Sequence, residues 1–160
     1  PRSTLFPYTT LFRSFDAILM DDGISYMTTV QDLTAAISSA FDHLESGGVM
    51  VVTPDVTRET FRQNQTTCAH GVKLYGPDDI DVVFVENNYD PDPTDGQYEM
   101  TAIYLIRDKG ALRIETDRFA LGIFPVEAWR RIVSDTGFIV HQKKYLDGGN
   151  EYISFACVKP

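Results

Sequence analysis

The chain is poor in cysteine, poor in basic side chains and without a long apolar run. Its two cysteines, Cys68 and Cys157, are too few and too far apart for a disulfide framework or a metal knuckle. We therefore expect thiols in a reducing cytoplasm. Lysine and arginine number 14 against 23 aspartates and glutamates, a formal charge of -9 that argues against a nucleic-acid partner. No apolar segment approaches the roughly 20 residues of a membrane helix, so we expect no membrane partner.

Metal-ligand patterns are equally scarce. Cys68 and His70 stand two positions apart, but two ligands alone do not make a zinc site. Asp90, Asp92 and Asp95 share one loop, yet prolines stand between them and no glutamate closes a calcium loop. We predict no metal site and interpret this acidic loop as a solvated turn.

What the sequence does contain is α/β patterning. Phe15 to Met20 is an almost unbroken apolar run, typical of a parallel strand covered on both faces. Asp21, Asp22 and Gly23 follow it as a turn. After a helical segment, Val49 to Val52 reads as a second buried strand. Strand, helix and strand in this order predict one βαβ unit.

The helix of this unit has its own start and stop signals. Thr28 with Gln31, or Thr29 with Asp32, would cap its first turn. Apolar residues at helical spacing predict one buried stripe, made of Val30, Leu33, Ile37, Ala40, Phe41 and Leu44. The pair Gly47-Gly48 is expected to end the helix through a left-handed cap.

From Ile80 onward the apolar residues alternate with polar ones. Val82 to Glu86, Gln97 to Arg107 and Ala111 to Phe119 are predicted strands, separated by glycine-containing turns. They predict an antiparallel meander inserted into the α/β unit. Just before it, Cys68 to Gly71 fits either a loop or the start of a strand.

The last part returns to α/β patterning. Pro125 suits the first position of a helix that Gly137 would end, with a buried stripe of Trp129, Ile132, Val133 and Thr136. Two further strands, Phe138 to Tyr145 and Tyr152 to Lys159, are joined by Asp147-Gly148-Gly149-Asn150. That connection is short enough for an antiparallel hairpin.

The beginning of the chain differs from the rest. Thr4 to Ser14 reads TLFPYTTLFRS, which matches the in-frame translation of a common short-read sequencing adapter at every position. The alternative is an apolar N-terminal strand. We expect residues 1–14 to be non-native, the native frame to begin near Phe15, and the chain to be a fragment whose earlier strands are missing.

Several of these segments resemble class I S-adenosylmethionine-dependent methyltransferases. FDAILMDDGISYM, the helix and HLESGGVMVV are similar to that fold's fourth strand, fourth helix and fifth strand, and the C-terminal hairpin to its last two strands. The meander and DRFALGIFPVEAWRRIVSDTGF resemble the sugar-amine and small-amine N-methyltransferases. The resemblance implies an α/β fold: the C-terminal part of a Rossmann-like methyltransferase sheet with an inserted antiparallel β meander. Residues 15–160 would be a partial methyltransferase domain with its insertion at about 80–119.

The resemblance also implies a site. S-adenosylmethionine would be the cofactor and a small, amine-bearing molecule the acceptor. Met20, Asp21, Asp22 and Gly23 would approach the methionine end of the cofactor, because ligands of doubly wound sheets bind at the carboxyl ends of strands. Tyr26 would face the acceptor. The alternative interpretation makes the two aspartates turn residues and Tyr26 a cover for the helix start.

Among the histidines, His70 is the one placed to line a substrate pocket, with a plain surface histidine as the alternative. His43 is expected at the helix end, where its ring favours the dipole. His141 is expected on a solvated face of a late strand.

The chain also departs from the family pattern. The glycine-rich E/D-x-G-x-G turn is absent from the sequence, and Phe119 stands where the amine-methylating group often has a histidine. Two alternatives therefore stay open. One is an inactive truncated fragment that forms a homodimer through its exposed first strand. The other is a nucleotide-binding α/β domain of another chemistry, such as a dehydrogenase.

Overall fold

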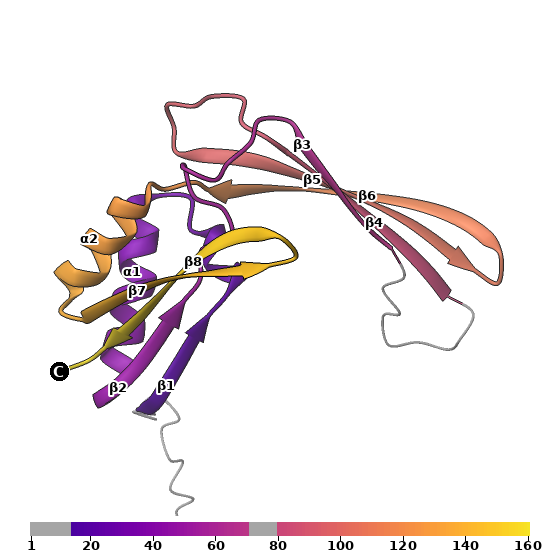
Figure 1. Cartoon of the computed structure of the whole chain (residues 1–160). Coiled ribbons are helices and arrows are strands. Elements are labelled where there is room, and N and C mark those ends of the chain that lie inside the picture. Colours follow the sequence, from indigo (N-terminus) through magenta and orange to yellow (C-terminus); the bar gives the residue numbers. More distant parts are fainter. Residues whose placement is uncertain (1–13, 71–79) are drawn as a thin grey trace, which may run out of the picture. The chain divides into compact units, whose positions relative to one another are not determined.

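The computed structural model describes residues 14–70 and 80–160, so most of the adapter-like segment lies outside the described residues. In chain order the elements are β1 (Phe15–Met20), the 3-10 helix η2 (Asp22–Tyr26), α1 (Val30–His43), β2 (Leu44–Val52), β3 (Gln65–His70), β4 (Ile80–Tyr89), β5 (Gln97–Asp108), β6 (Ala111–Gly122), α2 (Val126–Thr136), β7 (Ile139–Asp147) and β8 (Asn150–Val158) (Figure 1). They form two compact units. The first contains 14–24, Thr34–Pro54 and Arg130–Pro160, and the second contains Ser25–Leu33 and Asp55–Trp129.

The first unit is built on a mixed sheet with the order β1-β2-β8-β7. β1 and β2 are parallel, with Ala17 opposite Val49 and Met20 opposite Val52. β8, the last strand of the chain, lies between β2 and β7 and is antiparallel to both. The predicted βαβ unit and terminal hairpin are both present. Gly148 and Gly149 have φ angles of 56° and 85°, the two positive values that a type I′ hairpin turn requires.

The core of this unit is continuous from the sheet to the helices. Its fully buried side chains come from neighbouring elements: Ile37, Leu44, Met50, Val52, Val133, Phe155 and Cys157. The rings of Phe41 and Phe138 meet edge to face at 4.9 Å, and a Cβ on Gly137 would lie 3.3 Å from Phe41. Burial raises the pKa of the Cys157 thiol to about 12. The prediction that β1 is covered on both faces is wrong for the described residues, because Phe15 and Leu19 are 45% and 71% exposed and β1 is an edge strand of this sheet.

Helix α1 uses one of its two candidate caps. The Asp32 N–H donates to Thr29 Oγ1 at 3.1 Å, and the Thr29 hydroxyl donates to Asp32 Oδ2 at 2.7 Å. Of the predicted stripe, Leu33, Ile37, Ala40 and Leu44 are buried. Val30 is 43% exposed, so its place in the stripe was wrongly predicted.

The predicted end of α1 is wrong as well. The helix stops at His43, before the glycines, and Gly47 with φ 83° lies inside β2. Lys159 supplies the cap instead: its Nζ donates to the carbonyl oxygens of Phe41 and Leu44, each at 2.7 Å. A cationic side chain at a helix C-terminus satisfies free carbonyls and opposes the helix dipole. Gly47 donates its N–H to Lys159 O at 2.8 Å, which continues the pairing of β2 with the end of the chain.

The second unit contains an antiparallel sheet with the order β3-β4-β5-β6, drawn as a long twisted ribbon in Figure 1. The predicted meander is present, and each of its strands is longer than expected. For Cys68 to His70, β3 settles the open choice between loop and strand in favour of a strand, since Cys68 pairs with Val85; Gly71 lies outside the described residues. At the β5–β6 turn, Lys109 and Gly110 have φ angles of 49° and 85°.

A compact cluster anchors one end of this sheet. Tyr98, Leu121 and Ile123 are buried, and partly buried apolar side chains pack against them: Val56, Phe61, Met100 and Phe119. Next to the cluster begins the acidic loop, where Asp90 is buried. The Gln63 side-chain amide pairs with the Asp90 backbone at 3.0 and 3.1 Å. The solvated-turn interpretation is therefore wrong for Asp90, although Asp92 and Asp95 are exposed.

Helix α2 begins at Val126, one residue after the predicted start at Pro125. Gly137 with φ 113° comes after its last residue, as predicted. Its first N–H group, on Val126, donates to the Glu59 carboxylate at 3.0 Å. Trp129, Ile132 and Val133 form its buried stripe. In the part of the chain that the structure describes, no helix is both long and apolar enough to cross a membrane.

Candidate functional site

The turn after β1 is held in place by backbone hydrogen bonds. The Thr53 N–H donates to the Met20 carbonyl at 3.0 Å, so the β1–β2 pairing extends to the end of both strands. The Ile24 N–H then donates to the Asp21 carbonyl at 2.9 Å, which starts η2. Ile24 is buried, and it fixes the turn to the core. The turn thus stands at the carboxyl end of a parallel strand, where doubly wound folds bind ligands.

The predicted cofactor residues lie together in this turn. Met20 is half-buried, whereas Asp21, Asp22 and Gly23 are exposed. A Cβ placed on Gly23 would meet no atom within 4 Å, so the space above the turn is open. Two exposed carboxylates beside open space form a set of hydrogen-bond acceptors that suits a cationic amino group.

Tyr26 belongs to the second unit and is 52% exposed. Its ring meets the ring of Phe119 edge to face, with centroids 6.0 Å apart and an interplanar angle of 83°. A Cβ on Gly122 would lie 2.1 Å from the carbonyl oxygen of Met27. β6 therefore supports the segment that carries Tyr26 through a ring contact and through direct backbone packing.

Sequence reasoning missed this support. Phe119 was singled out only because a histidine often occupies its place in the resembling group. The signal that was available is the glycine in Leu121-Gly122-Ile123. A glycine near the end of an alternating strand is typical of a close backbone approach.

His70 is the last residue of β3, opposite Val83 in β4. Its side chain lies outside the described part of the structure, so its role stays a prediction. The roles of Met20, Asp21, Asp22, Gly23 and Tyr26 stay predictions too. Met20 through Gly23 are brought together in the first unit, and Tyr26 and His70 belong to the second.

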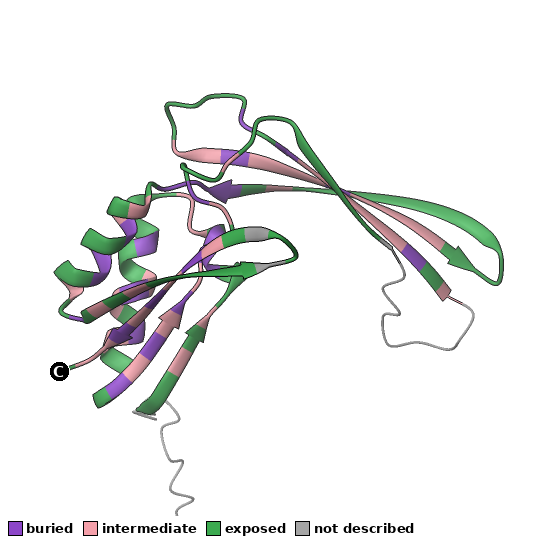
Figure 2. Ribbon diagram, viewed as in Figure 1, coloured by how far each residue is buried: buried purple, intermediate pink, exposed green. Residues whose placement is uncertain are grey.

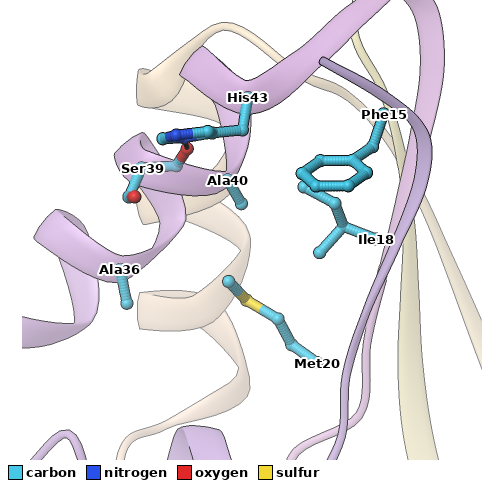
Figure 3. Close-up of a pocket in the computed structure, with 7 residues that line it drawn as sticks. All are labelled: Phe15, Ile18, Met20, Ala36, Ser39, Ala40 and His43. Carbon is cyan, nitrogen blue, oxygen red and sulfur yellow. Dashed lines mark hydrogen bonds between the residues drawn. The ribbon is translucent and has the colours of Figure 1, made fainter. Parts of the chain in front are cut away.

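An apolar pocket of about 520 Å³ lies beside the turn, between β1 and α1 (Figure 3). Its lining residues are Phe15, Ile18 and Met20 from the strand and Ala36, Ser39, Ala40 and His43 from the helix. The His43 Nδ1 is 2.8 Å from the Ser39 carbonyl oxygen, so the ring is bound to the helix end, as expected. The lining contains no carboxylate. Met20 connects the pocket to the turn, and the pocket suits an apolar group rather than a charged one.

Over residues 14–70 and 80–160, no group of three histidine, cysteine or acidic side chains is placed to hold a metal ion. The turn of the first unit offers hydrogen-bond acceptors and lies beside an apolar hollow, and Tyr26 of the second unit offers an aromatic face.

We compared the chain with protein-family models, curated proteins and solved structures. No family model matches the chain. Over 52 residues, which are 32% of this chain and 22% of the relative, it is 44% identical to a curated protein from Streptomyces venezuelae. That relative is a dTDP-3-amino-3,4,6-trideoxy-alpha-D-glucopyranose N,N-dimethyltransferase.

Solved structures match over nearly the whole chain. The crystal structure of DesVI from Streptomyces venezuelae superimposes with a TM-score of 0.79 and 24% identity, covering 94% of this chain and 61% of DesVI. The sugar N-methyltransferase KedS8 from a Streptoalloteichus species gives a TM-score of 0.74 and 21% identity, with 94% and 58% covered. CalS10, an amino pentose methyltransferase from Micromonospora echinaspora solved with bound S-adenosylmethionine, gives 0.73 and 19%, with 92% and 60% covered.

These likenesses confirm the predicted fold class and the resemblance to S-adenosylmethionine-dependent sugar N-methyltransferases. At 24% identity and below, the structural matches show the fold and not the chemistry. The chain spans about three fifths of the length of these solved structures.

Proposed function

We propose that this chain is part of an enzyme that transfers a methyl group from S-adenosylmethionine to the amine nitrogen of a small amino sugar. The observation that carries the proposal is the 44% identity over 52 residues with an amino-sugar N,N-dimethyltransferase. The sheet order supports it, because β8 inserted antiparallel between β2 and β7 gives the antiparallel end predicted from the methyltransferase resemblance.

The turn after β1 would hold the cofactor at its methionine end. S-adenosylmethionine supplies a methyl group on a positively charged sulfur and carries an ammonium group on its methionine part. The carboxylates of Asp21 and Asp22 are exposed acceptors for such an ammonium. Gly23, with open space above it, leaves room for the ligand to approach the backbone.

Tyr26 would act on the acceptor. An amine attacks a methyl group with its lone pair in line with the departing sulfur, so it must be unprotonated and correctly aligned. The Tyr26 hydroxyl can accept or donate a hydrogen bond and so orient that amine. Its ring is held by Phe119, which limits the positions that the hydroxyl can reach. His70 is the second candidate for receiving the proton that the amine loses.

The proposal is tested by following the transfer itself. The full-length gene product that contains residues 15–160 is incubated with S-adenosylmethionine labelled in its methyl group and with a dTDP-linked 3-amino sugar. We expect label in the sugar, and no label when a sugar with a hydroxyl replaces the amine. Transfer to the hydroxyl sugar alone would contradict the amine proposal. No transfer to either, with S-adenosylhomocysteine still bound, would favour an inactive protein.

Two variants separate the two roles. Asp22→Asn should weaken S-adenosylhomocysteine binding about tenfold, the effect of losing one charge-assisted hydrogen bond, with the acceptor KM unchanged. Tyr26→Phe should lower kcat/KM for the acceptor about tenfold and leave cofactor affinity unchanged. Asp42→Asn is the matched control, because Asp42 is an exposed carboxylate near the other end of α1. If Asp42→Asn weakens binding as much as Asp22→Asn, the role given to Asp22 is wrong.

A further inference from the structure

Tyr26 and Phe119 form a corner of two aromatic rings within the second unit. Their planes meet at 83°, with centroids 6.0 Å apart. Rings at this angle leave most of their faces uncovered, because the edge of one ring meets at most one face of the other. Those faces carry partial negative charge. Tyr26 is 52% exposed, so a ligand can reach this aromatic corner.

The Phe119 ring is held from the inner side of the sheet's end. β6 is exposed over its outer part and buried at its end (Figure 2), and Phe119 is the half-buried residue at this boundary. It packs against the cluster of Tyr98, Leu121 and Ile123, and Met100 stands opposite it on β5. The core of the second unit therefore fixes the ring, while part of the ring stays exposed beside Tyr26.

Carboxylates accompany Phe119 on its side of the sheet. Alternate residues of a strand share a face, so Asp117 stands on the same side, one row along β6. The strand register places Asn88 in the row of Phe119 and Glu86 in the row of Asp117. The Asn88 Nδ2 donates to Glu86 Oε1 at 2.7 Å, which draws this carboxylate toward the Phe119 row.

The neighbouring arginines are already paired with acids. Arg113 shares this side of the sheet, further along β6, and its Nε lies 3.5 Å from Glu115 Oε1. Arg118 follows on the opposite side, with its Nε 3.4 Å from Glu99 Oε1. Among the strand residues of this sheet that the structure describes, those close to Phe119 on its own side therefore carry negative charge. Such a surface attracts a cation.

We infer that the aromatic corner of Tyr26 and Phe119 binds the positive charge on the acceptor nitrogen, and that Phe119 determines a preference for a charged, N-methylated amine. The inference rests on the proposed methyl transfer. The faces of aromatic rings attract ammonium groups, and methylated ammonium ions are typical ligands of such rings. The carboxylates of Glu86 and Asp117 strengthen the attraction through their field.

Methyl transfer itself brings charge to the acceptor nitrogen. The lone pair of the neutral amine forms the new N–CH3 bond, and the electron pair of the broken S–CH3 bond stays on the sulfur. The positive charge thus passes from sulfur to nitrogen, and the ammonium product later releases one proton to water. Rings that bind the charged nitrogen better than the neutral amine lower the barrier. An amine that already carries one methyl group fits the same corner, so we expect it to be an acceptor as well.

Calorimetric titration of two matched compounds tests the inference on the full-length gene product that contains residues 15–160, with S-adenosylhomocysteine present. One compound is a dTDP-linked 3-dimethylamino sugar, whose amine is protonated at neutral pH. The other carries a neutral isopropyl group in place of the dimethylamino group. The two groups have the same shape, so the difference in affinity reports the charge. We expect the ammonium compound to bind about tenfold more tightly, and Phe119→Leu to reduce this preference to about twofold.

Three further variants control for the ring and for its position. Phe119→Tyr restores an aromatic ring and should keep the preference, and so should Tyr26→Phe, which loses only the hydroxyl. Phe84→Leu is the matched control, because Phe84 lies on the same side of the sheet with its ring 5.2 Å from that of Tyr104. It makes the same change away from Tyr26 and should leave the preference unchanged. Circular dichroism verifies the fold of each variant.

Equal binding of the two compounds by the wild type would overturn the inference, and so would a preference that survives Phe119→Leu or is lost equally in Phe84→Leu. The affinity for S-adenosylmethionine relative to S-adenosylhomocysteine should not change in Phe119→Leu. A fall in that ratio would overturn the inference too, because the ring would then face the cofactor sulfur. The methyl-transfer assay reports on the proposed function separately. A wild type that labels the amino sugar without preferring the charged compound contradicts this inference alone, whereas one that labels no amino sugar contradicts the proposed function.

Discussion

A close backbone approach at Gly122 in the second unit gives a sharp test of the structure. Gly122, near the end of β6, lies against the segment between η2 and α1. A Cβ at this position would come to 2.1 Å from Met27 O and 2.7 Å from a ring carbon of Phe124. Non-bonded atoms need more than 3 Å, so Gly122→Ala forces a backbone shift of about 1 Å.

β6 cannot easily make that shift. Gly122 pairs with Gln97 in the sheet, and the Ile123 N–H donates to Gly96 O at 2.8 Å. Overpacking of this kind costs about 1–3 kcal/mol, and backbone against backbone belongs at the upper end. For a chain of this length, we expect Tm to fall by about 5–10 °C. Because Met27 follows Tyr26, the shift should also move the Tyr26 ring away from Phe119.

The assay is thermal unfolding followed by circular dichroism, together with urea denaturation for the free energy of unfolding. Gly23→Ala is the control, because a Cβ there meets nothing within 4 Å and its φ is not positive. Replacing such a glycine should stabilise the chain by about 0.4–1 kcal/mol. Equal Tm values for Gly122→Ala and the wild type would refute the packing described for β6.

Three further predictions concern other parts of the chain. Because the Thr94 hydroxyl and then the Thr94 N–H donate to Asp92, the pKa of Asp92 is lowered. Thr94→Ala should raise it, as an NMR titration of the carboxyl would show. A lowered folded-state pKa stabilises the loop above the unfolded pKa, and that stability is lost as pH falls through the folded value. Burial raises the pKa of Cys157 to about 12, so this thiol should resist a thiol reagent at pH 8 until urea unfolds the chain. The reaction is measured in a Cys68→Ser variant. Lys159→Met should lower the free energy of unfolding by about 1–3 kcal/mol, measured in urea, since it leaves carbonyls at the end of α1 without their donor.

Much of the first unit could be predicted because its determinants are local. The apolar run of β1, the Thr29–Asp32 cap and the hairpin glycines each act within a few residues. Local signals of this kind also fixed the start of α2 after Pro125. The alternation along β5 and β6 predicted the meander for the same reason.

The features that were predicted wrongly or not at all depend on partners far away in the sequence. The end of α1 depends on Lys159, which is 118 positions from Phe41 in sequence. The burial of Asp90 depends on Gln63, 27 positions away. The first N–H of α2, on Val126, is bound by Glu59 across 67 positions. No local pattern encodes such partners.

The candidate site also combines locally determined features with features that depend on long-range contacts. That a turn follows β1 could be predicted, because the apolar run of the strand ends in Asp21-Asp22-Gly23. The contact of Tyr26 with Phe119 and the close approach of Gly122 to Met27 could not, because they join segments about 95 residues apart. The pocket between β1 and α1 also depends on side-chain packing that periodicity does not show.

The most direct test of the central proposal is calorimetric titration of S-adenosylhomocysteine and, in parallel, NADH into the full-length gene product that contains residues 15–160. We expect S-adenosylhomocysteine to bind with a Kd of the order of micromolar, weakened about tenfold by Asp22→Asn, and NADH not to bind. Binding of NADH without S-adenosylhomocysteine would contradict it and favour dehydrogenase chemistry on the same fold.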